Sequence, residues 1–411
     1  MADYIFKDEC ILIIGGGIET IPGVLKAKEL GLYVVISDID QNAPSIKYAD
    51  AFIQASTYNL DETLKAAIEF DNSVKKIKGV ICIATDVPLT VAHVAEYFKL
   101  KAVSMNTAEL ASDKLKMKLK FQEDAIPIPW FKGITTVEEL IKATKDKNFD
   151  LVLKPVDSRG ARGVIKLNES LDLNEVFLES IQYSQKKQLI IEQYLSGPQV
   201  STEAIIIDGK AFNIGFSDRN YEFLEKYSPN IIENGGELPS YLDKRIKRKV
   251  ELLIEKASKS IGVNDGIVKG DIVIYNGEPY VIEIATRLSG GYFCSHEIPL
   301  NTGVDFLKVA LMQTMGVFIP NSLLEIRKDS PVVQRYIFPN PGVVKQIILD
   351  QDLINHCNVH LFEIRVKLGD IIKEMKGHPS RAGLVITTGA NKKEALELAE
   401  SIISSVKIIT E

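Results

Sequence analysis

Residues 270–291 read GDIVIYNGEPYVIEIATRLSGG. This segment predicts two strands joined by a tight turn, because apolar and β-branched residues flank Asn276-Gly277, a pair that tolerates positive φ. Asp271 starts the first strand and Glu283 lies near the end of the second, so the hairpin would bring two carboxylates together. Two carboxylates followed by Arg287 suit Mg²⁺ held against phosphate, since this cation prefers oxygen ligands and an arginine neutralises phosphoryl charge. For this segment alone, a surface hairpin with solvated acids is the competing interpretation.

The composition indicates a soluble protein of several domains. A chain of 411 residues is too long for one ordinary core, so we expect two to four domains. Its 45% hydrophobic and 25% charged residues are typical of globular proteins, and a net charge of −6 argues against broad nucleic-acid binding. No apolar run approaches the ~20 residues that a membrane helix needs. Four scattered cysteines favour a reducing cytoplasm over a disulfide framework. We therefore expect a cytoplasmic protein that binds neither nucleic acid nor a membrane.

The first hundred residues have the pattern of a parallel βαβ unit. An apolar strand at 10–14 leads into Gly15-Gly16-Gly17, a helical pattern follows over 18–30, and a second strand at 33–36 precedes Asp38. A nicotinamide dinucleotide site with Asp38 on the ribose is the tempting interpretation. The third glycine of the usual spacing is missing, however, so the turn is a weak signal. Asp38 and Asp86 both follow strands, and either could contact a substrate.

Two lysines in the middle of the chain stand where phosphate could be held. Lys114 lies in the first turn of a lysine-rich helix, whose other lysines we mostly expect on a solvated face. Lys154 lies in a strand at 151–155 that leads into a loop of small residues, 158–163. The backbone N–H groups of such a loop can wrap phosphate oxygens. An ordinary flexible hairpin loop is the alternative.

Five elements in a fixed order resemble the ATP-grasp superfamily over roughly residues 110 to 315. They are Asp113-Lys114; Leu153-Lys154-Pro155 with its glycine loop; Glu192-Gln193-Tyr194-Leu195-Ser196-Gly197; Asp271 with Glu283; and Arg287 before Gly290-Gly291. The resemblance implies an α/β and α+β fold in three parts. These are a Rossmann-like domain at 1–110, an ATP-grasp domain at 111–320 with a lid subdomain at about 125–192, and a small C-terminal α+β domain at 321–411.

The resemblance also assigns residues to roles. The ATP-binding residues would be Lys114, Lys154, Ser158, Gly160, Gly163, Glu192, Tyr194, Leu195 and Gln199. Asp271 and Glu283 would hold Mg²⁺ or Mn²⁺, and Arg287 and Lys154 would serve the reacting phosphoryl group. Two positions depart from the family pattern. Gln199 stands where many members have a ribose-binding Glu, and Ala285 stands where an Asn often ligates a second metal, so the number of metals stays open.

The branch that the sequence resembles is the dipeptide-forming, carboxylate–amine ligase branch. Its pattern points to substrate contacts at Asp218, Arg219, Glu233, Ser289, Gly290 and Gly291. The expected reaction forms an amide through an acyl-phosphate, releases ADP and phosphate, and uses an amino acid among its small carboxylate and amine substrates. A biotin-independent carboxylase that uses ATP and bicarbonate, and a non-catalytic nucleotide-binding module, are the alternatives. Arg381 would either close over the site or form a structural salt bridge. A homodimer is left open.

Overall fold

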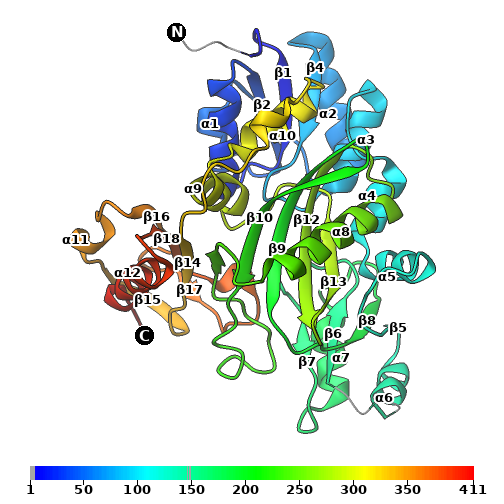
Figure 1. The fold of residues 1–411 in the computed structure, drawn as a ribbon, viewed down its shortest axis with the longest axis vertical. Coiled ribbons are helices and arrows are strands. Elements are labelled where there is room, and N and C mark those ends of the chain that lie inside the picture. The colour runs from blue at the N-terminus through cyan, green and yellow to red at the C-terminus, as the bar shows by residue number, and fades with distance from the viewer. Residues whose placement is uncertain (1–4, 146, 148–149) are drawn as a thin grey trace.

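The computed structural model describes residues 5–145, 147 and 150–411, and the chain forms three parts around one central sheet (Figure 1). The N-terminal part has a parallel sheet in the order β3-β2-β1-β4. Its strands are β1 (Cys10–Ile14), β2 (Tyr33–Asp38), β3 (Ala51–Gln54) and β4 (Ile77–Ile81), and its helices are α1 (Ile21–Glu29), α2 (Leu60–Ser73), α3 (Pro88–Phe98) and α4 (Met105–Ser112). This arrangement is the expected Rossmann-like one.

Strand β1 is apolar throughout because both of its faces are covered. Ile11 and Ile13 pack in the cluster that contains α1 and α10 residues, whereas Leu12 packs in the cluster that contains α2 and α3 residues. A strand buried on both sides loses the alternation of polar and apolar residues that a half-exposed strand shows. The strand at residues 10–14 is therefore apolar on both faces, and the glycine turn follows directly at its carboxyl end.

A second, four-stranded sheet, in the order β5-β8-β6-β7, lies where the lid subdomain is expected, and we refer to it as the lid. It contains β5 (Phe131–Ile134), β6 (Leu151–Pro155), β7 (Ile165–Lys166) and β8 (Leu189–Gln193), with helices α6 (Val137–Lys145) and α7 (Leu173–Ile181). Helix α5 (Lys114–Glu123) precedes it, and the backbone N–H of Lys114 donates to the carbonyl of Val156 at 2.9 Å. That bond ties the start of α5 to the end of β6, so two phosphate-site candidates, Lys114 and Lys154, are held close together.

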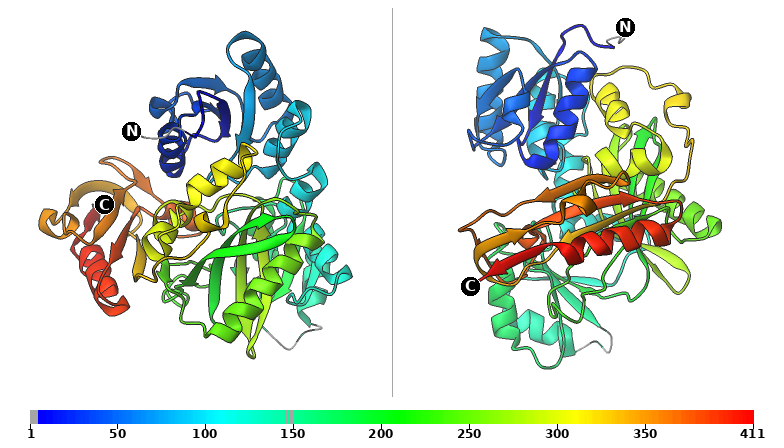
Figure 2. Two further views of the ribbon diagram at one scale, coloured as in Figure 1. Left: turned by 45° about the horizontal axis from the view of Figure 1, so that its top comes forward. Right: turned by 90° about the vertical axis from the view of Figure 1, so that its left-hand side faces the viewer.

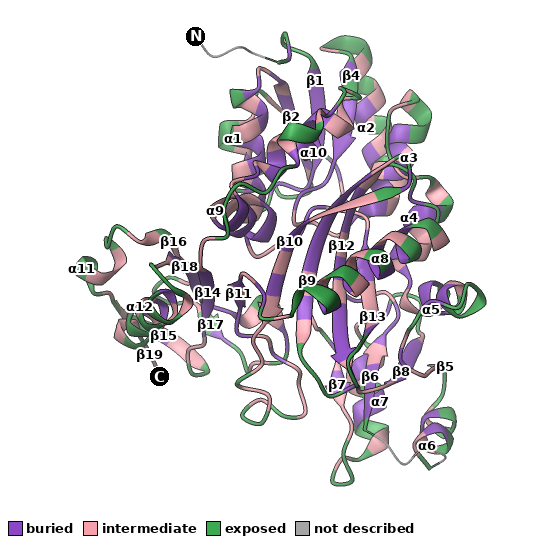
Figure 3. Cartoon of the chain, in the orientation of Figure 1, coloured by how far each residue is buried: buried purple, intermediate pink, exposed green. Residues whose placement is uncertain are grey.

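The largest sheet has eight strands in the order β13-β12-β9-β10-β11-β14-β18-β16. Its elements are β9 (Gln199–Ile207), β10 (Lys210–Arg219), β11 (Gly236–Leu238), β12 (Gly266–Tyr275), β13 (Glu278–Ala285), β14 (Val332–Ile337), β16 (Val359–Ile364) and β18 (Gly383–Thr388). Because β11 pairs with β14, the sheet continues without a break from the central part into the C-terminal part. Figure 3 shows these strands mostly buried, with helix α8 (Lys244–Ser260) presenting an exposed outer face.

The remaining elements cover the sheet on the C-terminal side. A π-helical turn at Phe293–Glu297 continues into α9 (Ile298–Thr302) and α10 (Phe306–Thr314), which lie against the N-terminal part. The C-terminal part adds α11 (Gln351–Ile354), α12 (Lys392–Ser405) and a small sheet of β15 (Gly342–Ile348), β17 (Ile371–Ile372) and β19 (Lys407–Thr410). Its place beside the central part is clearest in Figure 2. Among the residues described, no helix is long and apolar enough to cross a membrane.

The hairpin expected at residues 270–291 forms as β12 and β13. Asn276 and Gly277 have φ values of 51° and 77°, as a two-residue hairpin turn with positive φ at both central positions requires. Asp271 pairs directly with Glu283 across the two strands. Residues that are directly opposite in an antiparallel pair point to the same face, so the two carboxylates lie on one side of the sheet.

Candidate active site

A cavity of about 660 Å³ opens where the lid, the central sheet and the N- and C-terminal parts meet. Most of the residues expected from the sequence line it. They are Lys114, Lys154, Ser158, Gly160, Glu192, Tyr194, Leu195, Gln199, Arg219, Glu233, Asp271, Glu283, Arg287, Ser289, Gly290 and Gly291. The fold therefore brings residues from separate segments of the sequence into one space.

Two expected site residues lie outside the cavity lining. Gly163 has a φ of +71°, and an added Cβ would meet a ring carbon of Tyr183 at 2.8 Å, so this glycine serves tight packing. Asp218 accepts hydrogen bonds from the Ser240 hydroxyl at 2.6 Å and from the backbone N–H of Tyr241 at 2.7 Å. These contacts give Asp218 a role in holding the segment after β11.

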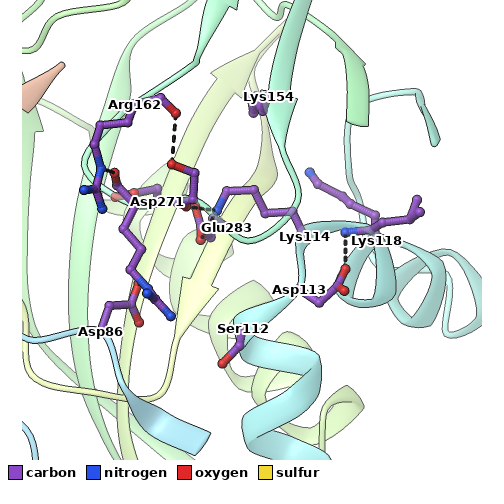
Figure 4. A network of polar contacts seen from close by, with 12 residues as sticks. Asp86, Ser112, Asp113, Lys114, Lys118, Lys154, Arg162, Asp271 and Glu283 are labelled. Carbon is purple, nitrogen blue, oxygen red and sulfur yellow. Dashed lines mark hydrogen bonds and ion pairs between the residues drawn. The ribbon is translucent and has the colours of Figure 1, made fainter. Parts of the chain in front are cut away.

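The acid pair of the hairpin is neutralised by cations (Figure 4). Asp271 accepts from Lys269 Nζ at 2.6 Å and lies 3.2 Å from Arg219 Nη1. Burial acts to raise the pKa of the Asp271 carboxyl, but Arg219 and Lys269 outweigh burial and hold that pKa well below its usual range. Glu283 forms an ion pair with Lys114 at 3.1 Å. Asp271 is therefore ionised at neutral pH.

This pair of carboxylates fits a hard divalent cation. Mg²⁺ is commonly held by one or two carboxylates and completes its octahedral shell with substrate phosphates and water. Within the described parts of the chain, no cluster of three or more His, Cys, Asp or Glu side chains could hold a metal ion. A Mg²⁺ bound at Asp271 and Glu283 would therefore have few protein ligands, and Ala285, which also lines the cavity, offers no side-chain oxygen.

The lysine of strand β6 pairs with a buried glutamate. Lys154 Nζ lies 3.1 Å from Glu192 Oε2, and Lys118 Nζ lies 3.5 Å from the same oxygen. Lys118 is 1% exposed and also donates to the carbonyl of Val281 at 2.9 Å. Burial lowers the pKa of Lys118 to about 8, and Glu192 opposes that shift. The expectation of a mostly solvated lysine face is wrong for Lys118, which is one helical turn after Lys114 and points inward.

Residues 158–162 of the small-residue loop line the cavity. Gly160 and Ala161 have φ values of 63° and 57°, so the backbone turns through the left-handed region twice in succession. The carbonyl of Ser158 accepts from Lys114 Nζ at 2.8 Å, and the carbonyl of Gly160 accepts from the backbone N–H of His378 at 2.9 Å. Arg159 reaches Asp86 of the N-terminal part at 3.4 Å. The loop thus contacts both neighbouring parts of the molecule.

Two family models match the chain in the regions that build this site. An ATP-grasp domain model matches residues 111–291, and a model of the L-amino acid ligase C-terminal domain 2 matches residues 335–411. Residues 111–291 form an ATP-grasp domain. The expected fold class is confirmed, since solved ATP-grasp structures align over nearly the whole chain.

Three relatives illustrate the likeness. An alanine–anticapsin ligase of Bacillus subtilis (strain 168) is 26% identical over 243 residues, covering 53% of this chain and 50% of the relative. The chain thus matches about half the length of that curated protein. The crystal structure of an L-amino acid ligase from Bacillus licheniformis aligns with a TM-score of 0.83 at 19% identity, covering 99% of this chain and 100% of the other. An N5-carboxyaminoimidazole synthetase from Staphylococcus aureus, complexed with ADP, aligns at 0.73 and 18%, covering 96% and 97%.

Arg287 and the glycine turn after it lie on the side of the ATP-grasp cavity that faces the N-terminal part. Arg287 pairs with Asp86 at 3.4 Å. Burial acts to raise the pKa of Asp86, but Arg287 and then Arg159 outweigh burial and lower it. Gly291 has a φ of +67°, and a Cβ there would meet the Tyr336 hydroxyl at 2.7 Å. Only glycine fits this position without strain.

The N–H groups of this turn are already engaged by acids from elsewhere in the ATP-grasp chain. The N–H of Ser289 donates to Glu203 Oε1 at 2.8 Å, and the N–H of Gly291 donates to Glu19 Oε2 at 2.7 Å. Arg365 of the C-terminal part donates to the other oxygen of Glu19 at 2.7 Å. Burial raises the pKa of Glu203 to about 7. Three segments far apart in sequence therefore fix one turn.

Arginines and acids also line the end of the cavity that is shared with the C-terminal part. Arg219 donates to Glu233 at 2.7 Å. Arg381 stacks on the ring of Tyr336, with its guanidinium carbon 3.7 Å from the ring centroid, and donates to the carbonyl of Glu233. Arg381 lines the cavity and lies 3.9 Å from the Glu233 carboxylate, which agrees with the structural salt bridge, while closure over the site stays a prediction.

Several cavity residues were not assigned from the sequence. From the sequence, Asp86 is only an acid that follows a strand, but that position already indicates a residue close to a ligand. Lys118 lies outside the cavity lining but contacts the lining residue Glu192, and its signal is weaker: its place one turn after Lys114 on the same helix face. Glu19, Arg365 and Glu297 also line the cavity, and no local pattern marks them.

Proposed function

We propose that this protein is an ATP-dependent ligase that joins a carboxylate to an amine, with an amino acid among its substrates. One observation carries the proposal. The cavity holds two lysines that could bind phosphate, Lys114 and Lys154, and a pair of carboxylates, Asp271 and Glu283. It also holds Arg287, which is followed by a glycine turn. The names of the relatives, an alanine–anticapsin ligase and an L-amino acid ligase, support the choice of an amino acid.

The ion pairs in the cavity suggest how nucleotide would bind. Lys114 pairs with Glu283, and Lys154 pairs with Glu192. On binding, the ATP phosphates would replace the acids as partners of these lysines, and the oxygens of Asp271 and Glu283 would bind Mg²⁺ instead. Such an exchange keeps every charge compensated, which matters because an unpaired buried charge is costly. The metal, when bound, supplies neutralisation of the β- and γ-phosphate charge.

The chemistry then depends mainly on alignment and charge. A substrate carboxylate oxygen attacks the γ-phosphorus, ADP leaves, and an acyl-phosphate forms. Arg287 stabilises the charge on the transferring phosphoryl group, and the loop at 158–163 excludes water from the acyl-phosphate. The amine then attacks the acyl carbon and releases phosphate. Positioning of this kind needs no nucleophilic side chain from the protein.

The test supplies MgATP with twenty L-amino acids labelled with ¹⁸O in the carboxylate. We expect ADP and phosphate, with one ¹⁸O atom in each phosphate released on amide formation. Pyrophosphate and AMP as products would contradict the mechanism. Phosphate release that needs bicarbonate and no amine would favour the carboxylase. ATP binding without turnover would favour the non-catalytic module.

A further inference from the structure

Glu297 is the unusual acid of the cavity. It ends the π-helical turn at Phe293–Glu297, it lines the cavity, and it is only 3% exposed. Among the residues that the structure describes, no hydrogen bond or ion pair reaches its carboxyl. A buried carboxylate without a partner is unfavourable, so this group lacks a counterpart that the other acids of the cavity already have.

The neighbouring acids make the contrast clear. Glu203 accepts from the N–H of Ser289, and Glu233 is paired with Arg219. Glu19 is held by Arg365. Each of these acids has a donor supplied by the protein, whereas Glu297 has none among the described residues.

The surroundings of Glu297 favour a cation. Burial is the main cause that raises the pKa of Glu297 to about 8, and the negative charges of Glu233 and Glu203 add to it. Tyr336 of the adjacent strand β14 is the other titratable group that faces Glu297, and Arg381 is already stacked on the ring of Tyr336. The charges that act on Glu297 are those of two acids, and a positively charged group beside Glu297 would offset them.

The position of Glu297 relative to the reacting groups is fixed by the backbone. The N–H of Phe293 donates to the carbonyl of Gly290 at 3.4 Å, and the Cys294 thiol donates to the carbonyl of Ser289 at 3.3 Å. The N–H of Glu297 donates to the carbonyl of Tyr292 at 3.3 Å. The π-helical turn is thus folded back on the segment that follows Arg287, and Glu297 lines the same cavity as Arg287.

We propose that Glu297 binds the α-ammonium group of the amine substrate, an amino acid, and accepts the proton that this group loses before it attacks. The inference rests on the ligase reaction proposed above. An α-ammonium group is cationic at neutral pH and donates three hydrogen bonds, so it supplies the donor that Glu297 lacks. A general base works best when its pKa lies near the working pH.

The proton balance of the step is complete. The ammonium group transfers one proton to the Glu297 carboxylate and becomes a neutral amine. The amine nitrogen forms the bond to the acyl carbon, the acyl–oxygen bond to phosphate breaks, and the second amine proton leaves with the phosphate as HPO₄²⁻. The Glu297 carboxylic acid returns its proton to solvent before the next turnover.

The test separates the two half-reactions in the full-length enzyme. MgATP and an equimolar mixture of twenty L-amino acids are supplied, and dipeptides are measured. In parallel, hydroxylamine traps the acyl-phosphate as a hydroxamate, because hydroxylamine is largely uncharged at neutral pH and needs no base. We expect Glu297→Gln to lower dipeptide formation about 100-fold, the lower range for loss of a general base, and to lower hydroxamate formation far less. Glu297→Asp, which keeps a carboxyl, should restore part of the dipeptide rate.

The pH profile and a control variant complete the test. The wild-type dipeptide rate should rise with pH toward about 8, as the Glu297 carboxyl ionises, and Glu297→Gln should lose that rise. Glu325→Gln, at an exposed acid outside the cavity, should leave both rates unchanged.

Equal losses of dipeptide and hydroxamate in Glu297→Gln would overturn the inference, because they would indicate a structural role. Unchanged dipeptide formation in that variant would overturn it as well. A wild-type enzyme that forms hydroxamate but no dipeptide would overturn it while leaving carboxylate activation intact. A wild-type enzyme that forms neither would instead refute the proposed ligase function.

Discussion

The two ends of the cavity treat their acids differently. At the hairpin end, Asp271 and Glu283 contact protein cations, and Lys154 contacts Glu192. At the end that borders the C-terminal part, Glu233 is paired with Arg219, whereas no cation among the described residues is paired with Glu297. A site for phosphate and metal needs both cations and acids, which can pair with each other until the ligands bind. A site for an ammonium group needs an acid that has no ion-pair partner in the protein.

The largest expected effect is on turnover at the hairpin end. Glu283→Gln removes one of two oxygen ligands for Mg²⁺ and the ion-pair partner of Lys114. We expect steady-state phosphate release to fall by at least about 100-fold, as when one stabilising group of an active site is removed, with circular dichroism unchanged. Glu278→Gln is the matched control, since Glu278 lies on the same strand but is exposed. Full activity in Glu283→Gln would remove the metal assignment.

The next largest effect concerns nucleotide affinity. Lys154→Ala deletes a charge expected on the ATP phosphates, and a charge-assisted contact in a buried site contributes about 2 to 3 kcal/mol. We expect the Kd for MgATP to rise about 100-fold by calorimetry. Lys142→Ala, on the exposed face of helix α6 in the same lid, should leave the Kd unchanged. An unchanged Kd in Lys154→Ala would argue that the hairpin end does not bind phosphate.

A third prediction tests Glu203 through the pH dependence of the protein's stability. The pKa of Glu203 is raised from 4.5 to about 7 in the folded protein. The stabilising contribution of its protonated form is therefore complete below about pH 4.5 and is lost as the pH rises through about 7. That loss amounts to about 3 kcal/mol. In Glu203→Gln, urea unfolding at pH 5 and pH 8 should show a correspondingly smaller loss of stability than in the wild type. Equal losses in both proteins would contradict the raised pKa of Glu203.

The smallest expected effect is at Gln199, which lines the cavity and which the family resemblance assigns to the ribose of ATP. A carboxylate accepts hydrogen bonds from a ribose more strongly than an amide does. We expect Gln199→Glu to lower the Kd for MgATP about threefold, and to leave the Kd for inorganic tripolyphosphate, which has no ribose, unimproved. Equal tightening for both ligands would show that Gln199 is not at the ribose.

The same comparison explains what the sequence could predict. The hairpin, the Lys154 strand and the loop at 158–163 are local features, because turn-forming residues and alternating apolar residues mark them directly. The acids of the other end carry no such mark. Glu203 reads as one more residue of a strand and Glu297 as one more residue after a glycine turn. Their burial depends on packing between segments that the sequence keeps apart.

Lys118 shows a related limit from the opposite direction. A lysine in a helix rich in lysines is normally solvated, so the composition predicts an exposed Lys118 side chain. In the fold, this side chain instead lies against Glu192. The glycine turn shows a third case. Gly290 and Gly291 were expected to offer N–H groups to substrate, but the N–H of Gly291 is held by Glu19, which is 272 positions away in the chain.

That contact has a consequence for the order of folding during synthesis. Glu19 precedes its second partner, Arg365, by 346 positions. Chains emerge from the ribosome with the N-terminus first, so the N-terminal part and strands β9 to β13 can form while this corner of the cavity still lacks Arg365. A nascent chain that ends before Arg365 therefore lacks the assembled corner of the site.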